Sequence, residues 1–173
     1  MKKQLLKSAM IALTGIGLIT GSASAYSFEN IIDTWKILGV ESGVQPLVEG
    51  SPFSYTHDIN DSVDLAAGDY VTEAYLELDF TNDLSDAYGS IRSKIGTIKW
   101  DFREYATVGF NGTSWVNIGE VDNDQYDIIL DIDWLNDDGK LDVTINISNP
   151  TKGVAAVAYL DHSRLYGTAQ AAP

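Results

Sequence analysis

Apolar and acidic side chains alternate with a period of two along much of this chain, and this pattern constrains its fold more than any other feature. Such an alternation predicts half-buried strands of an antiparallel sheet. It is clearest in residues 126–134, and it recurs in residues 70–80 and 141–147. The side chains expected to point inward are Tyr126, Ile128, Leu130, Ile132 and Trp134, then Tyr70, Thr72, Ala74, Leu76, Leu78 and Phe80, and finally Leu141, Val143, Ile145 and Ile147.

Turn signals separate the alternating segments. Asn111-Gly112 predicts a two-residue hairpin turn, and residues 136–139 predict a turn between the strands on either side. Gly96, where the apolar parity switches, predicts a β-bulge, and residues 31–38 are interpreted as the first strand. The sequence therefore predicts one all-β domain over residues 26–173, an antiparallel, jelly-roll-like β-sandwich of about eight to nine strands.

The first 25 residues have the pattern of a cleaved secretory signal. Three lysines precede an apolar stretch from Ala9 to Ile19, and small residues close the segment at Ala23-Ser24-Ala25. The apolar part is too short for a spanning helix, so we expect the mature chain to begin at Tyr26 without a membrane span. The leader predicts a protein that a bacterium secretes to its surface or extracellular matrix.

The charge and the cysteine content exclude several classes of function. The chain has a formal net charge of −14, and loss of the three leader lysines makes it −17 (8 Lys+Arg against 25 Asp+Glu). Such a surface repels nucleic acid and anionic membranes, because binding to them depends on neutralising phosphates. The absence of cysteine excludes thiol catalysis and thiolate metal sites.

Clustered carboxylates make calcium the candidate cofactor. Oxygen ligands two or three residues apart in a loop can converge on a hard cation, although such clusters are also common in ordinary turns. The first candidate cluster follows a predicted strand over residues 53–57, and the second follows the strand over residues 70–80. The two clusters are Asp58, Asn60 and Asp61, and Asp79, Asn82 and Asp83.

No catalytic residue is assigned from the sequence. Each of the two histidines adjoins an aspartate, in His57-Asp58 and Asp161-His162, but neighbours on a strand point to opposite faces. A serine such as Ser54 or Ser163 could pair with a histidine, yet no nucleophile-elbow motif surrounds either one. A hydrogen-bonded structural role is therefore expected for both histidines. Among the aromatics, Trp115 beside the hairpin turn is a candidate sugar platform, whereas Trp100 and Trp134 match the core parity.

Four short motifs, in their order, resemble a known family. They are FSYTHDI at residues 53–59, VTEAYLEL at 71–78, DGKLDVTI at 138–145 and YLDHSRLYG at 159–167. Over residues 31–167 the chain resembles the ectodomains of bacterial PEP-CTERM proteins, which an exosortase sorts in biofilm-forming bacteria. The resemblance implies a β-sandwich at the cell surface or in the matrix, with no established catalytic residue.

The end of the chain departs from that family. Its members end in a Pro-Glu-Pro-like signal, a hydrophobic span and basic residues, whereas this sequence stops at Ala171-Ala172-Pro173. The sorting tail is therefore expected to be either removed or absent from a released member. Resemblance and charge together add Asp161 to Asp58 as a suspected cation ligand.

Three functions follow from these observations. The preferred one is a secreted, non-enzymatic structural or adhesive component of the cell surface or biofilm matrix, stabilised by calcium. The first alternative is a carbohydrate-binding module for extracellular polysaccharide, and the second is a polysaccharide hydrolase. The expected partners are extracellular polysaccharide or other copies of the chain, which residues 26–48 would join by adding a strand to a neighbour's sheet.

Overall fold

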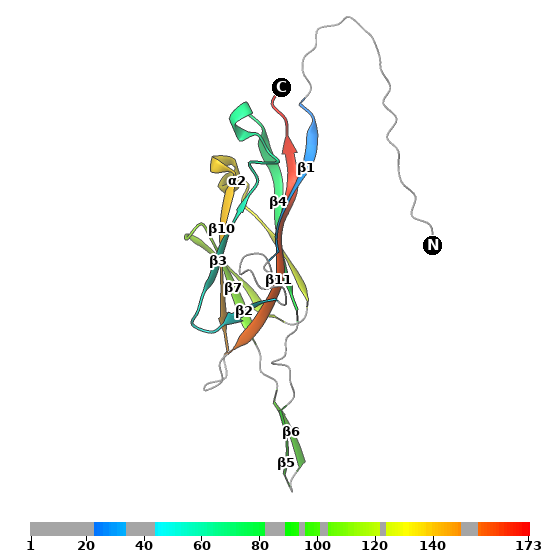
Figure 1. Cartoon of the computed structure of the whole chain (residues 1–173), viewed down its shortest axis with the longest axis vertical. Coiled ribbons are helices and arrows are strands. Elements are labelled where there is room, and N and C mark those ends of the chain that lie inside the picture. Colours follow the sequence, from blue (N-terminus) through cyan, green and yellow to red (C-terminus); the bar gives the residue numbers. More distant parts are fainter. Residues whose placement is uncertain are drawn as a thin grey trace, which may run out of the picture.

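The computed structural model describes residues 23–33, 44–81, 89–93, 96–100, 104–121, 124–149 and 156–173. Figure 1 shows two facing layers of long strands, with the short helix α2 (Asp133–Asp138) at one end. A single 3₁₀ turn (Leu65–Ala67) precedes the fourth strand. The strands are β1 (Ala25–Asp33), β2 (Gln45–Val48), β3 (Phe53–Asp58), β4 (Tyr70–Phe80), β5 (Gly89–Ser93), β6 (Gly96–Trp100), β7 (Tyr105–Phe110), β8 (Ser114–Glu120), β9 (Gln125–Ile129), β10 (Lys140–Ser148) and β11 (Val157–Gln170).

The strand order is that of a jelly roll. One sheet has the order β1-β11-β4-β9, with β2 also paired to β11, and the other has the order β3-β10-β7-β8. All of these pairs are antiparallel, and the chain passes back and forth between the two sheets as it wraps the sandwich. The prediction of a jelly-roll sandwich of eight to nine strands is confirmed. The β5–β6 hairpin forms a separate two-stranded sheet between β4 and β7 in the sequence.

The core lies between the two layers, where the inward side chains of both sheets meet. Leu141, Val143, Ile145 and Ile147 of β10 are all buried, as their alternation predicts. They face the buried leucines of β4 and β11, among them Leu76, Leu78 and Leu165. Burial of this apolar surface is the main term that stabilises the sandwich.

The start of β4 departs from the predicted parity. Ala74, Leu76, Leu78 and Phe80 are buried as expected, but Val71 replaces Tyr70 and Thr72 as the inward residue. The cause is a register shift against β11, where Thr168 pairs with Glu73 and Ala169 pairs with Val71. One extra residue in β4 reverses the parity of everything before it.

The predicted strand over residues 126–134 is wrong beyond Ile129, because α2 follows it. The helix ends at Gly139, whose left-handed backbone (φ 74°) lets its N–H bond the carbonyl of Leu135 at 2.8 Å. The side-chain amide of Asn136 exchanges two hydrogen bonds with the backbone of Val71, at 2.7 and 3.0 Å, and so fastens the helix to β4. Residues 136–139, predicted as a turn, therefore form the end of a helix. Trp134 packs against the core as expected, stacked on Phe110 at 5.3 Å.

The predicted hairpin turn is confirmed, whereas the predicted bulge and the predicted start of the first strand are wrong. Asn111 (φ 47°) and Gly112 (φ 67°) form the predicted turn between β7 and β8. Gly96 is wrong as a bulge, because it opens β6 and pairs with Ser93 across a hairpin. The first strand begins earlier than predicted, at Ala25. Residues 34–38 of the predicted first strand and the side chain of Trp100 lie outside the described part of the chain.

Candidate functional site

A β-bulge near the start of β11 brings Asp161 and His162 to the same face. Leu160 pairs with Phe80 and His162 pairs with Asp79, so β11 has one extra residue, Asp161, relative to β4. The two neighbouring side chains meet, with Nδ1 of His162 3.1 Å from Oδ2 of Asp161. The expectation that sequence neighbours here point apart is wrong, since a bulge interrupts the alternation on which it rests.

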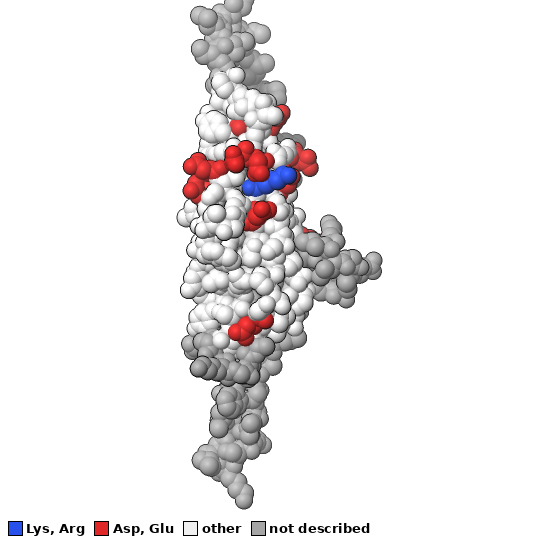
Figure 2. All heavy atoms as spheres, turned by 90° about the vertical axis from the view of Figure 1, so that its left-hand side faces the viewer, with Lys and Arg blue, Asp and Glu red and all other residues white. Residues whose placement is uncertain are grey.

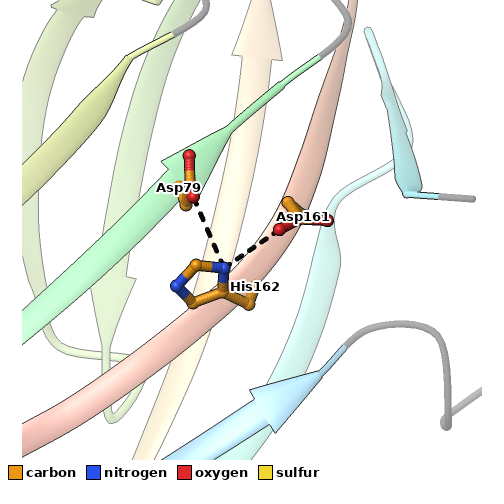
Figure 3. Close-up of side chains that lie close together, drawn as sticks. All are labelled: Asp79, Asp161 and His162. Carbon is orange, nitrogen blue, oxygen red and sulfur yellow. Dashed lines mark hydrogen bonds and ion pairs between the residues drawn. The ribbon is translucent and has the colours of Figure 1, made fainter.

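Asp79, from the end of β4, completes a cluster on the outer face of this sheet (Figure 3). Its Oδ2 lies 3.5 Å from Nδ1 of His162, and the possible ligand atoms of Asp79, Asp161 and His162 lie within 4.8 Å of one another. On the other side of the ring, Nε2 of His162 lies 3.4 Å from Oε1 of Glu77. Two of the predicted metal ligands, Asp79 and Asp161, are therefore brought together by strand pairing.

The charges of this cluster depend on one another. Burial lowers the pKa of His162, but hydrogen bonds to Asp161 and Glu77 and the charge of Asp79 outweigh that effect and raise it. Burial raises the pKa of Asp79, and the negative charges of neighbouring carboxylates, among them Asp161, add to this effect. Two residues further along β11, Arg164 donates hydrogen bonds to Glu29 at 2.8 Å and to Glu77 at 3.4 Å. A protonated His162 thus places a positive charge among these carboxylates, in addition to that of Arg164 beside Glu77, and a metal ion would compete with the proton of His162.

The donor set of the cluster differs from that of a typical calcium site. Calcium prefers oxygen ligands alone, whereas an imidazole nitrogen with two carboxylates suits zinc and similar divalent ions. Calcium stays a prediction, and the nitrogen of His162 makes zinc the ion that best fits these residues.

The other predicted ligands lie elsewhere. Oδ1 of Asp58 accepts hydrogen bonds from the backbone N–H of Asn60 at 3.0 Å and from its side-chain amide at 2.8 Å. The same amide donates to the carbonyl of Asp138, and Lys140 lies 3.9 Å from Asp58. These contacts hold the turn after β3 against the end of α2. The strand β3 belongs to the other sheet from β4, which carries Asp79. Asp61 in that turn is exposed, and Asn82 and Asp83 lie outside the described residues.

A second polar group is buried between the sheets. Nε2 of His57 lies 2.9 Å from the hydroxyl of Ser163, and Nδ1 lies 2.7 Å from Oδ1 of Asn30. The arrangement has the parts of a nucleophile, a base and an orienting group. However, His57 and Ser163 are both 0% exposed, so a substrate has no access to the hydroxyl. The hydrogen bonds tie β3, β11 and β1 across the sandwich, which is the structural role expected for His57.

Apart from Trp115, the outer face of the β3-β10-β7-β8 sheet was not predicted from the sequence. Its middle carries hydroxyl and amide side chains instead of charges, although the chain is strongly acidic. Figure 2 shows this face, with an uncharged middle and acidic side chains gathered mainly toward one end. We call its middle the uncharged face. The sequence does contain a signal for this face, because the outward positions of β10 change from the charged Asp142 to the uncharged Thr144 and Asn146. The outward side chains in the middle of the face are Ser54, Thr107, Trp115, Asn117, Thr144 and Asn146.

A cleft of about 400 Å³ lies at the acidic end of that face. Trp134 lines it from α2, and Asn111 lines it from the hairpin turn. Its charged lining consists of Lys140 and four aspartates, namely Asp133, Asp137, Asp138 and Asp142. The cleft is thus a polar extension of the sheet face.

Comparison with known proteins adds little to this description. No family model and no curated protein matches the sequence. Among solved structures, a chain of Desmodium yellow mottle tymovirus is similar over 99% of this chain and 94% of that chain, with 11% sequence identity and a TM-score of 0.40. The jelly-roll assignment rests on the strand order. Within the described residues, no helix has both the length and the apolar character needed to cross a bilayer.

Proposed function

We propose that this chain is a secreted, non-enzymatic adhesive domain of the bacterial cell surface or biofilm matrix. The observation that carries the proposal is the uncharged middle of the outer face of the β3-β10-β7-β8 sheet, on a chain of net charge −14. Charged side chains keep an acidic protein soluble and apart from its neighbours, so a broad face without them favours contact. The leader-like first 25 residues support export, because they have the charge, apolar stretch and small-residue end of a secretory signal.

The buried histidine argues against one type of enzyme, a serine hydrolase. Among the described residues, the serine nearest to a histidine nitrogen is Ser163, and it is completely buried beside His57. A hydrolytic serine must reach its substrate, so this pair cannot act without opening the sandwich. The buried pair therefore argues against hydrolysis by a serine nucleophile among the described residues. Hydrolysis of a polysaccharide by two carboxylates uses no such pair and is not addressed by this observation.

A charge placed in the middle of the face should reduce adhesion. Asn146→Asp changes an amide to a carboxylate of nearly the same shape, so the expected effect is electrostatic. We expect the variant to lose most of the wild-type retention on the matrix of the producing bacterium, measured as the bound fraction after washing. Gln125→Glu, which adds the same charge on exposed β9 of the other sheet, should bind as wild type. Equal retention of Asn146→Asp and wild type would place the contact elsewhere.

The proposal includes a divalent cation held by Asp79, Asp161 and His162, which would tie β4 to β11. A ligand that binds only the folded state at 100 times its dissociation constant stabilises by about 2.7 kcal/mol, or roughly 5 to 10 °C in midpoint. We expect zinc, and more weakly calcium, to raise the thermal midpoint relative to chelator. Asp161→Asn should abolish the shift, and Asp58→Asn should keep it. If the melting curves of the wild type with metal and with chelator coincide, the chain binds no cation at this cluster. If Asp58→Asn alone loses the shift, the cation site lies in the turn after β3.

A further inference from the structure

We infer that the uncharged face of the β3-β10-β7-β8 sheet binds a neutral polysaccharide, with Trp115 as its stacking platform. The inference rests on the proposed adhesive function and names the chemical class of its ligand. It places the ligand on outward side chains of strands whose inward side chains form the core.

Cross-strand pairing sets polar side chains in rows across this face. In one row Thr144 pairs with Ser54 on one side and with Gly109 on the other, and Gly109 pairs with Trp115. The hydroxyls of Ser54 and Thr144 lie 2.9 Å apart. In the next row Asn146 pairs with Thr107, which pairs with Asn117. At a strand spacing of about 4.8 Å, the first row, across four strands, is about 14 Å wide, and the second, across three, is about 10 Å wide, lengths suited to a few sugar units of a chain.

Trp115 lies flat against the sheet at the position where a side chain is missing. A Cβ atom added to Gly109 would come within 2.9 Å of three atoms of the indole ring, Cζ2, Cη2 and Cζ3. The ring therefore rests on the backbone of Gly109, and the side chain is still 53% exposed. One ring face is held by the sheet and the other is open to solvent, which is a rigid surface for stacking.

The chemistry of the face fits a neutral carbohydrate better than other ligands. A sugar ring presents an apolar C–H face that can lie on an indole, and hydroxyls around its edge that pair with hydroxyls and amides. A protein partner is expected to find several aromatic or arginine anchors, whereas among the described side chains of these two rows Trp115 is the one aromatic. Tyr105 stands in the next row, beside Ser148 and Glu120. An anionic polymer would be repelled by the acidic cleft at one end, where four aspartates surround Lys140. These features select an uncharged, hydroxyl-rich chain.

Native affinity electrophoresis of the full chain tests the inference. The gels would contain one neutral polymer each, namely dextran, laminarin or galactomannan, and alginate would serve as the anionic comparison. We expect at least one neutral polymer to retard the protein and alginate not to do so. Trp115→Ala should weaken binding at least about tenfold, because a central tryptophan usually dominates a contact. Thr144→Val, which removes one hydroxyl, should weaken it by about threefold to tenfold.

Tyr70→Ala is the matched control, since it removes an exposed aromatic (45% exposed) from the other sheet. It should bind as wild type, and Trp115→Tyr should keep much of the wild-type affinity. The inference is overturned if no neutral polymer retards the folded protein, or if Trp115→Ala binds as tightly as wild type. In either case, loss of matrix retention in Asn146→Asp would leave the adhesive function standing without its carbohydrate ligand.

Discussion

Acidification from pH 7 to pH 4 is expected to destabilise this fold by about 3 kcal/mol through His57 alone. Burial lowers the pKa of His57 to about 4, from an ordinary value of 6.5. Between these two values the unfolded chain binds a proton on this residue and the folded chain does not. Stability therefore falls as the pH falls from 6.5 to 4, and levels off below that range with respect to this group.

Urea unfolding at several pH values measures this effect. His57→Gln removes the titration and retains an amide that can bond Ser163 or Asn30, so its stability should change less between pH 7 and pH 4. His162→Gln is the control with the opposite sign. The raised pKa of His162 stabilises the folded state below its ordinary pKa, and this contribution is lost as the pH rises through the folded-state value. Identical pH profiles for wild type and His57→Gln would show that His57 is not buried as described.

Gly167→Ala should destabilise the protein by at least about 3 kcal/mol, or prevent folding. A Cβ at this position would lie 2.0 Å from the backbone carbonyl oxygen of Glu73 and 3.0 Å from Cα of Ala74. Backbone atoms cannot rotate away as a side chain can, so β4 and β11 would have to separate. These two strands pair along most of their length at the middle of their sheet.

Gly50→Ala separates this steric effect from the general cost of replacing a glycine. Gly50 has a positive φ of 79°, but a Cβ there would have no atom within 4 Å. It should cost about 1 kcal/mol, from backbone conformation alone. Urea unfolding of both variants compares the two costs. Wild-type stability of Gly167→Ala would contradict the close approach of β4 to β11.

The alternation of side chains was enough to predict the layers of this fold. Wherever a strand pairs without interruption, as β10 does, its inward residues could be read from the sequence, because the period of two follows from strand geometry. The pattern failed at Thr72 and at Asp161, where one extra residue reverses the parity. No residue type marks such a bulge, since it depends on how two distant strands align.

The helix α2 and the cluster of Asp79, Asp161 and His162 could not be predicted from the sequence, for related reasons. Ile132 and Trp134 continue the alternation of β9, so the pattern favours a strand, whereas contacts such as those of Asn136 with Val71 and of Phe110 with Trp134 favour the helix. Carboxylates were predicted to cluster by closeness in sequence, as around Asp58. Asp79 and Asp161 instead meet through the pairing of β4 with β11, which one sequence does not display.

The uncharged face was harder to predict, because it consists of residues with no special chemistry. Thr144 and Asn146 are ordinary outward residues of a strand, and their meaning appears only when four strands stand side by side. Trp115 was noticed as an aromatic beside a turn, but its support by Gly109 depends on the register of β7 and β8. Strand register therefore sets both the stacking surface and its polar surroundings.

Hydroxyl-radical footprinting of the chain, free and bound to the matrix of the producing bacterium, tests the central claim most directly. Trp115, Tyr70 and Ile129 are all exposed in the free chain, and they report on the two opposite sheets. If the uncharged face makes the contact, Trp115 should lose most of its oxidation on binding, while Tyr70 and Ile129 keep theirs. Protection of Tyr70 and Ile129 with Trp115 still oxidised would contradict the account and place the adhesive surface on the β1-β11-β4-β9 sheet.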